Sequence, residues 1–160
     1  MANGKNKSIP ITEDGLKMLQ EELEYLRTVG RSEVAQRIGD AKSDGDISEN
    51  AGYDEAKNQQ AFLEGRIMEL ELKLKHAVVI QNHDTPVGQV GLGRSVTIQE
   101  VGYPDQETYL LVGSAEANPS NGRISNESPM GRSMINKKVG DRFHVDTPGG
   151  ALEFEIVAVD

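Results

Sequence analysis

A regular pattern of apolar residues in the first half of the chain most limits what it folds into. Positions on one edge recur at alternating spacings of four and three residues. The pattern consists of Ala56, Gln60, Leu63, Ile67, Leu70, Leu74 and Ala77. A repeat of this kind keeps one face of a helix apolar along its length and is typical of a coiled-coil seam. It predicts a long helix with an apolar edge that needs a partner.

The partner helix is expected immediately upstream. Thr12 is a plausible N-cap, and Glu13 and Asp14 suit the positive end of a helix dipole. The apolar face then follows Leu16, Leu19, Leu23 and Leu26, is interrupted by Gly30 and Ser32, and resumes at Val34, Ile38 and Ala41. Two such helices joined by a short glycine-containing bend predict an antiparallel helical hairpin, with the bend at its far tip.

The second half of the chain has a different character. Pro86 and several glycines in residues 81–93 end the helical pattern and indicate a linker. Alternating or continuous apolar runs then predict strands at 94–101, 107–113, 142–147 and 151–159. A short helix with Ser128 as its N-cap and a turn at 147–150 complete the pattern. We expect an α+β protein with two domains: a helical hairpin over 1–80 and an antiparallel-sheet domain over 81–160.

Composition excludes several classes of function. The chain has no cysteine, so disulfides, cysteine zinc sites and thiol catalysis are excluded. Its net charge is −9, with 17 basic and 26 acidic residues, which disfavours tight binding of bare nucleic acid. The polar start and the lack of a long apolar run predict a soluble cytoplasmic protein without a membrane segment.

The bend itself is unusually acidic. The stretch KSDGDISENAGYDEAK, residues 42–57, contains Asp44, Asp46, Glu49, Asp54 and Glu55. An EF-hand calcium loop does not fit, because the position that needs glycine holds Glu49. Magnesium retains several waters and takes few protein carboxylates, so Asp46 and Glu49 suit a partial shell completed by a second macromolecule. The residues alone favour a simpler reading, in which Glu49 and Asn50 cap the second helix, Asp54 and Glu55 lie in its first turn, and the acids are otherwise solvated.

The tip sequence GDISENAGYDEAK, residues 45–57, resembles that of the GreA/GreB family of bacterial transcript-cleavage factors. The resemblance extends to ITEDGLKMLQEELEYL, QQAFLEGRIMELELKL, YLLVGSAEANP, ISNESPMGRSMI and VDTPGGALEFEIVAV. It covers the chain from about residue 9 to the end. Weak basic content in the hairpin favours the GreA type over the GreB type. Gly52 departs from the family, which often has glutamate there, and is expected to loosen the start of the second helix.

The resemblance implies an antiparallel coiled coil followed by an FKBP-like domain that docks on bacterial RNA polymerase at the β′ coiled coil. The hairpin enters the secondary channel and stimulates the polymerase's own cleavage of backtracked RNA; the factor is not itself an enzyme. The family's tip carboxylates fall on Asp46 and Glu49, which help hold the second Mg²⁺ together with the polymerase. Contacts to the 3′ end of the nascent RNA fall on Lys42, Lys57 and Tyr53. The remaining tip-motif residues are Gly45, Ser48 and Asn50. DNA is contacted only indirectly, through the elongation complex.

Three other functions remain open at this point. A non-cleaving relative would occupy the channel and inhibit the polymerase, but such a protein is expected to alter the tip, and Asp46 and Glu49 are intact. A prolyl isomerase would need an aromatic-lined pocket, and the second half has only Tyr103, Tyr109, Phe143 and Phe154. A plain coiled-coil adaptor would tolerate replacement of both tip carboxylates.

Overall fold

The computed structural model describes residues 7–45, 50–81 and 85–160. The chain divides into two compact units. One is Lys17–His76, and the other combines the described parts of Met1–Leu16 and Ala77–Asp160. The second unit therefore draws on both ends of the chain, and the long helices form the first.

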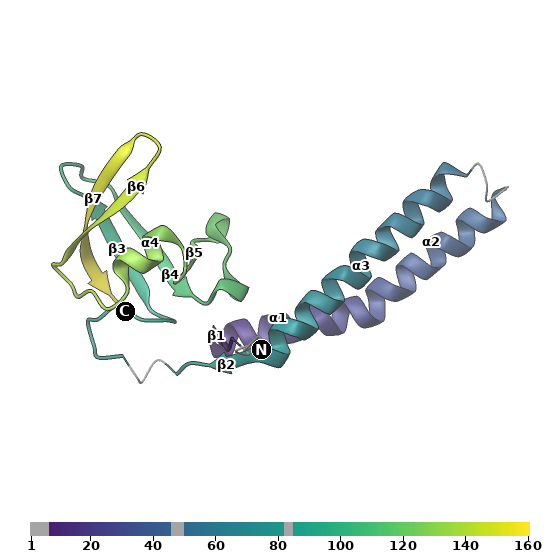
Figure 1. Ribbon diagram of the computed structural model, residues 1–160, viewed down its shortest axis with the longest axis horizontal. Helices are drawn as coiled ribbons and strands as arrows, with labels where there is room; N and C mark the ends of the chain where they lie inside the picture. The colour runs from purple at the N-terminus through teal and green to yellow at the C-terminus, as the bar shows by residue number, and fades with distance from the viewer. Residues whose placement is uncertain (1–6, 46–49, 82–84) are drawn as a thin grey trace, which may run out of the picture. The chain divides into compact units, whose positions relative to one another are not determined.

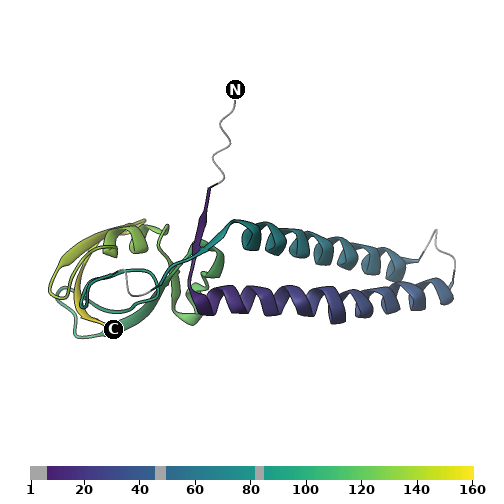
Figure 2. The same cartoon turned by 90° about the horizontal axis from the view of Figure 1, so that it is seen from below.

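Helices form the unit Lys17–His76. Helix α1 (Glu13–Tyr25) enters it, a π-helical turn η1 (Leu26–Gly30) follows, and α2 (Arg31–Ser43) completes the first arm. The returning arm is α3 (Ala51–His76). The two arms lie side by side and run in opposite directions, as both views show (Figures 1 and 2). The expected antiparallel hairpin is confirmed.

The predicted seams form the hairpin's core. The buried residues are Leu19, Leu23, Gly30 and Val34 on the first arm and Ala56, Ile67 and Leu70 on α3. At the expected interruption of the apolar face the chain stays helical, with Gly30 buried and Ser32 exposed. Ala77 is also misassigned, since α3 ends at His76 and Ala77 begins a strand.

The π-helical turn explains how the first arm keeps its seam facing α3. Seam positions 26, 30, 34 and 38 are separated by four residues each, which exceeds the mean spacing of 3.5 in a heptad seam. A succession of fours would rotate the apolar edge away from a partner helix. A π-helical turn holds one more residue than an α-helical turn, and it occurs here at Leu26–Gly30.

A two-stranded parallel pair belongs to the other unit. Strand β1 (Ile9–Ile11) pairs with β2 (Ala77–Val79), with Ile11 opposite Val79. Ile11 is fully buried. Residues separated by the whole hairpin are therefore joined at its base by backbone hydrogen bonds.

The larger sheet of this unit has five strands in the order β5-β4-β3-β7-β6 (Figure 1). The strands are β3 (Ser95–Glu100), β4 (Gln106–Val112), β5 (Arg123–Ser125), β6 (Arg142–Thr147) and β7 (Gly150–Val159). All neighbouring pairs are antiparallel except β4 and β5, which are parallel. The expected antiparallel sheet is confirmed, with one parallel pair at its edge. The chain between β4 and β5 passes through two short 3₁₀ turns, η4 (Ser114–Glu116) and η5 (Pro119–Asn121). Strand β5 then runs in the same direction as β4.

The core of the sheet domain contains the apolar residues that alternate along the strands. It consists of Val90, Val96, Ile98, Leu111, Ile124, Met134, Phe143, Val145 and Ile156. The short helix α4 (Pro129–Met134) contributes Met134, and Ser128 caps it by accepting a hydrogen bond from the Gly131 amide at 3.1 Å. The expected α+β fold class, a helical hairpin with an FKBP-like sheet domain, is confirmed. Within the described residues, no helix is long and apolar enough to span a membrane.

Candidate functional site: the tip of the hairpin

The hairpin tip is framed by the last turn of α2 and the first turn of α3. Helix α2 ends at Ser43 with Asp44 as its C-cap, and α3 begins at Ala51. Asp46, Ser48 and Glu49 lie outside the described residues. The expected roles of Asp46 and Glu49 as carboxylate donors therefore remain predictions, and the structure describes the helix ends on either side of them.

Asn50 is the residue that organises this frame. Its side-chain Oδ1 accepts a hydrogen bond from the Tyr53 amide at 3.2 Å, which caps the N-terminus of α3. Its Nδ2 donates to the backbone carbonyl of Ala41 at 2.5 Å. Ala41 lies in the last turn of α2, where carbonyls lack helical partners. One side chain therefore satisfies a free donor of α3 and a free acceptor of α2.

Gly52 lies beside the capping side chain of Asn50. Residue 52 lies inside the first turn of α3, so the helix is formed there despite the glycine. A Cβ at Gly52 would lie 3.2 Å from Oδ1 of Asn50. The missing side chain leaves room for the capping oxygen.

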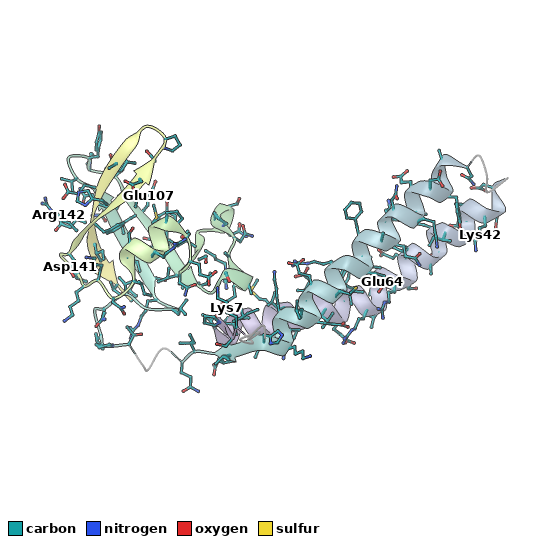
Figure 3. The ribbon with its side chains drawn as sticks, in the orientation of Figure 1. Lys7, Lys42, Glu64, Glu107, Asp141 and Arg142 are labelled. Atoms are coloured by element: carbon teal, nitrogen blue, oxygen red, sulfur yellow. The ribbon has the colours of Figure 1, made fainter. Side chains whose placement is uncertain are left out.

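The predicted RNA-contacting residues flank this frame. Lys42 is exposed in the last turn of α2 (Figure 3), and Gly45, the next motif residue, is also exposed. Lys57 is exposed on α3, where its Nζ donates to Oε1 of Gln60 at 3.0 Å. Tyr53 is half-buried in the first turn of α3. The structure brings these residues to one end of the hairpin, and nothing in it tests their contact with RNA.

A hollow of about 430 Å³ lies between the two helices beside Asn50. Its charged lining residues are Arg37, Asp40, Asp44 and Glu55. Arg37 donates to Oε1 of Gln59 at 2.6 Å across the hairpin. Among the residues that the structure describes, no group of three or more acidic, histidine or cysteine side chains is arranged to hold a metal ion. The described residues therefore form no complete cation site, although carboxylate oxygens such as those of Asp46 and Glu49 suit Mg²⁺.

Ion pairs between the arms fix the register that places the tip. Arg31 donates to both carboxylate oxygens of Glu64 at 2.9 and 3.0 Å (Figure 3 labels Glu64). The hydrogen bonds from Arg31 lower the pKa of Glu64. Nearer the base, Arg66 makes a similar fork to Glu22 at 2.7 and 2.9 Å, which raises the pKa of the guanidinium. A planar guanidinium that grips both oxygens is geometrically selective, so these pairs specify one alignment of the arms.

Comparison with known proteins identifies the family. The family model described as "Transcription elongation factor, N-terminal" (GreA/GreB) matches residues 9–79. The model "Transcription elongation factor, GreA/GreB, C-term" matches residues 84–160. The chain belongs to the GreA/GreB family of transcription elongation factors.

Two bacterial relatives agree with this assignment. The transcription elongation factor GreA of Thermoanaerobacter pseudethanolicus is 49% identical over 154 residues, which is 96% of this chain and 98% of the relative. The GreA of Bacillus cereus strain ATCC 14579 is 48% identical over 153 residues, 96% of this chain and 97% of the relative. A solved structure of the transcription factor Gfh1 is 30% identical, covers 96% of this chain and 97% of its own, and has a TM-score of 0.47. The expected membership of the family, and its GreA type, are confirmed.

Sequence reasoning placed Asn50 in the tip motif but did not predict its bond to Ala41. An asparagine directly before a helix is a recognisable capping signal. Its second hydrogen bond depends on how closely the end of α2 approaches the start of α3, which no local pattern reveals.

Proposed function

We propose that this member of the GreA/GreB family stimulates the cleavage of backtracked RNA by bacterial RNA polymerase, and that the polymerase supplies the active site. The observation that carries the proposal is the position of the acidic segment at the end of a long, thin helical rod. Helix α3 alone has 26 residues, a length of roughly 39 Å at about 1.5 Å per residue. Such a rod suits delivery of side chains into the secondary channel of the polymerase.

Asp46 and Glu49 are the groups that the rod delivers. Their carboxylate oxygens suit Mg²⁺, which polarises phosphoryl oxygens and activates water when it is held with the polymerase. Asn50 ties together the two helix ends from which these residues extend. Lys42 and Lys57 contribute positive charge toward the 3′ end of the extruded RNA, and Tyr53 supplies an aromatic face for a base.

The charge of the chain agrees with a factor recruited by a protein. A net charge of −9 disfavours tight, sequence-independent binding of nucleic acid by the chain alone. Binding then depends on the sheet domain docking against the β′ coiled coil of the polymerase at the channel mouth. DNA is reached only through the elongation complex, and the setting is the bacterial cytoplasm.

The test is RNA cleavage by stalled, backtracked elongation complexes over a range of Mg²⁺ concentrations. Four samples are compared: no factor, the natural protein, the Asp46→Ala/Glu49→Ala variant, and a control variant that loses two exposed acids of α1, Glu21→Ala/Glu24→Ala. Polymerase binding of each is measured by competition with a labelled natural protein. We expect the natural protein and the control to accelerate cleavage, and the tip variant to bind without accelerating it.

Two results would count against the proposal. Equal acceleration by the tip variant would reduce the acidic tip to a helix cap and solvated surface. Binding of the natural protein without acceleration would favour a non-cleaving inhibitor that blocks the channel.

A further inference from the structure

A buried carboxylate holds the beginning of α1. Glu116, in η4, is only 7% exposed. Its Oε2 accepts hydrogen bonds from the Thr12 amide at 2.8 Å and the Gly113 amide at 3.2 Å. Its Oε1 accepts from the Thr12 hydroxyl and from Nη2 of Arg123, the latter at 3.3 Å. Buried carboxylates are stable only when their oxygens are satisfied in this way.

The same carboxylate lies against the first turn of α1. Thr12 is the N-cap of this helix, since its Oγ1 accepts from the Gly15 amide at 3.1 Å. The N-terminus of a helix carries partial positive charge, so a negative group is stabilised there. Glu116 therefore binds the start of α1 through hydrogen bonds to the cap residue and through the helix dipole.

Two glycines make this close approach possible. A Cβ at Gly15 would lie 1.8 Å from Oε1 of Glu116, a distance at which no side chain fits. A Cβ at Gly113 would lie 1.9 Å from the carbonyl oxygen of Pro10. The backbone of Gly15 therefore lies directly against the Glu116 carboxylate, and the backbone of Gly113 lies directly against strand β1.

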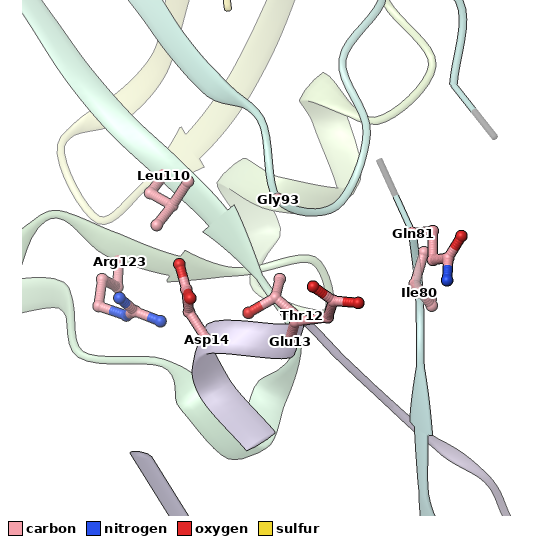
Figure 4. A pocket seen from close by; sticks show the side chains of 8 residues that line it. All are labelled: Thr12, Glu13, Asp14, Ile80, Gln81, Gly93, Leu110 and Arg123. Atoms are coloured by element: carbon pink, nitrogen blue, oxygen red, sulfur yellow. The ribbon is translucent and has the colours of Figure 1, made fainter. Parts of the chain in front are cut away.

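Packing next to this contact is incomplete. A pocket of about 370 Å³ is lined on one side by Thr12, Glu13 and Asp14 and on the other by Leu110 and Arg123 (Figure 4). The start of α1 is attached by the polar contacts of Glu116 and by strand β1, whose Ile11 is buried and which pairs with β2. Removal of the carboxylate is expected to loosen the helix start at this point.

We propose that Glu116 is a positioning residue for the hairpin. It fixes the first turn of α1 to the sheet domain and so limits the directions that the rest of the hairpin explores. The effect of this restraint on RNA cleavage rests on the proposed function. A hairpin tip that must reach the polymerase active site works best when its directions of approach are limited before binding. Glu116 itself contacts neither RNA nor metal in this proposal.

The first test measures the free protein and needs no polymerase. The chain has no cysteine, so spin labels attach only where cysteines are introduced. Suitable exposed positions are Ala61 on α3 and Asp146 on β6. We expect Glu116→Ala to broaden the distance distribution between the labels, Glu116→Gln to do so less, and the control Glu107→Gln to leave it unchanged.

A pair of variants separates positioning from simple loss of folding. Gly15→Ala places a methyl group on the Glu116 carboxylate and should broaden the distribution as Glu116→Ala does. Added to Glu116→Ala, the same change should have little further effect, because the group with which it collides is gone. Circular dichroism of each variant checks that the helices remain folded.

The second test measures cleavage at saturating factor. We expect Glu116→Ala to lower the maximal rate roughly 10- to 100-fold while polymerase binding changes little, since misplacement by about 1 Å costs rates of this order. Unchanged label distances together with an unchanged maximal rate would overturn the proposal. Failure of the natural protein to stimulate cleavage would overturn the proposed function instead, and the label distances would still decide the role of Glu116.

Discussion

The side-chain amide of Asn50 donates a hydrogen bond to the backbone carbonyl of Ala41 at 2.5 Å, joining the start of α3 to the last turn of α2. The same side chain caps α3 through the Tyr53 amide. The end of α2 and the start of α3 are thereby joined through this side chain. One asparagine therefore satisfies a backbone acceptor of α2 and a backbone donor of α3.

Replacement of Asn50 should separate its two roles. Asn50→Ala loses the cap and the bond to Ala41, each worth about 1 kcal/mol. Asn50→Asp retains an acceptor for the Tyr53 amide but places a carboxylate against the Ala41 carbonyl. We expect hydrogen exchange at the Tyr53 and Asp54 amides to be about 5- to 30-fold faster in the alanine variant and nearly unchanged in the aspartate variant.

Cleavage assays complete this prediction. Both variants should lower the maximal rate of stimulated RNA cleavage, because both release α2 from α3 at the tip. Asn58→Ala, an exposed change directly after Lys57 on α3, is the matched control and should behave as the natural protein. Full activity of Asn50→Asp would show that the bond to Ala41 does not matter for the tip.

The hairpin could be predicted from the sequence because its signal is local and repeated. Each seam position reinforces its neighbours three and four residues away, and the caps at Thr12 and Ser128 act within their own helices. The hairpin turn between β6 and β7 was equally readable, with Thr147 Oγ1 donating to the Gly150 carbonyl at 2.6 Å. In each case the residues that specify the structure are close in the sequence.

Features that depend on distant partners were not predicted. Strands β1 and β2 have three residues each, too few to show a period, and their pairing joins Ile9 to Ala77. Glu116 looks like an ordinary surface acid in its own segment, and its burial is decided by Thr12, 104 residues away. The tip carboxylates Asp46 and Glu49 were assigned through family resemblance, since an acidic bend alone is as well explained by capping and solvation.

Two glycines of the first arm should respond oppositely to alanine. Gly39 is exposed with nothing within 4 Å of its added Cβ, so Gly39→Ala should stabilise the helix by up to about 1 kcal/mol. At the buried Gly30 the added Cβ would lie 3.0 Å from Cδ1 of Leu63 in the seam. This crowding should offset the helix propensity and leave Gly30→Ala less stable than Gly39→Ala by about 1 kcal/mol or more.

Thermal unfolding followed by the helical circular dichroism signal tests this pair. Gly39→Ala should melt above the natural protein and Gly30→Ala below Gly39→Ala. The Gly30→Ala/Leu63→Ala double variant distinguishes crowding from a backbone effect, because removal of the Leu63 methyl groups should reduce the penalty of the added Cβ. Equal melting of both single variants would mean that the seam repacks without cost at Gly30.

The hairpin should lose stability in acid through Glu69. Hydrogen bonds from Lys73, and secondarily from Arg66, lower the pKa of this carboxyl below its ordinary value. A carboxyl with a depressed pKa stabilises the fold above its unfolded pKa, and that contribution is lost as the pH falls through the folded pKa. We expect the melting temperature to fall between about pH 5 and pH 3 and to fall less in Lys73→Gln. Lys75→Gln, an exposed change two residues beyond Lys73 on α3, is the control. An identical loss of stability in acid in all three proteins would exclude Glu69 as the cause.

The sheet domain should show the opposite pH dependence at Tyr109. Its hydroxyl donates to Oε2 of Glu107 at 2.5 Å, and this bond raises the pKa of Tyr109 to about 12. A group with a raised pKa stabilises the fold below its unfolded pKa of 10.0, and the contribution disappears as the pH rises through about 12.

Glu107→Gln removes the charge that opposes ionisation of Tyr109. In that variant the pKa of Tyr109 should lie closer to 10.0. The loss of folding stability between about pH 10 and pH 12 should then be smaller than in the natural protein. An NMR titration of carbon-labelled tyrosine rings measures this, with the Tyr109 signal assigned by Tyr109→Phe. Glu155→Gln, a change on β7 away from this hydroxyl, should leave the Tyr109 titration where it is. A Tyr109 signal that titrates at the same pH with and without Glu107 would show that the hydrogen bond does not hold the phenol protonated in solution.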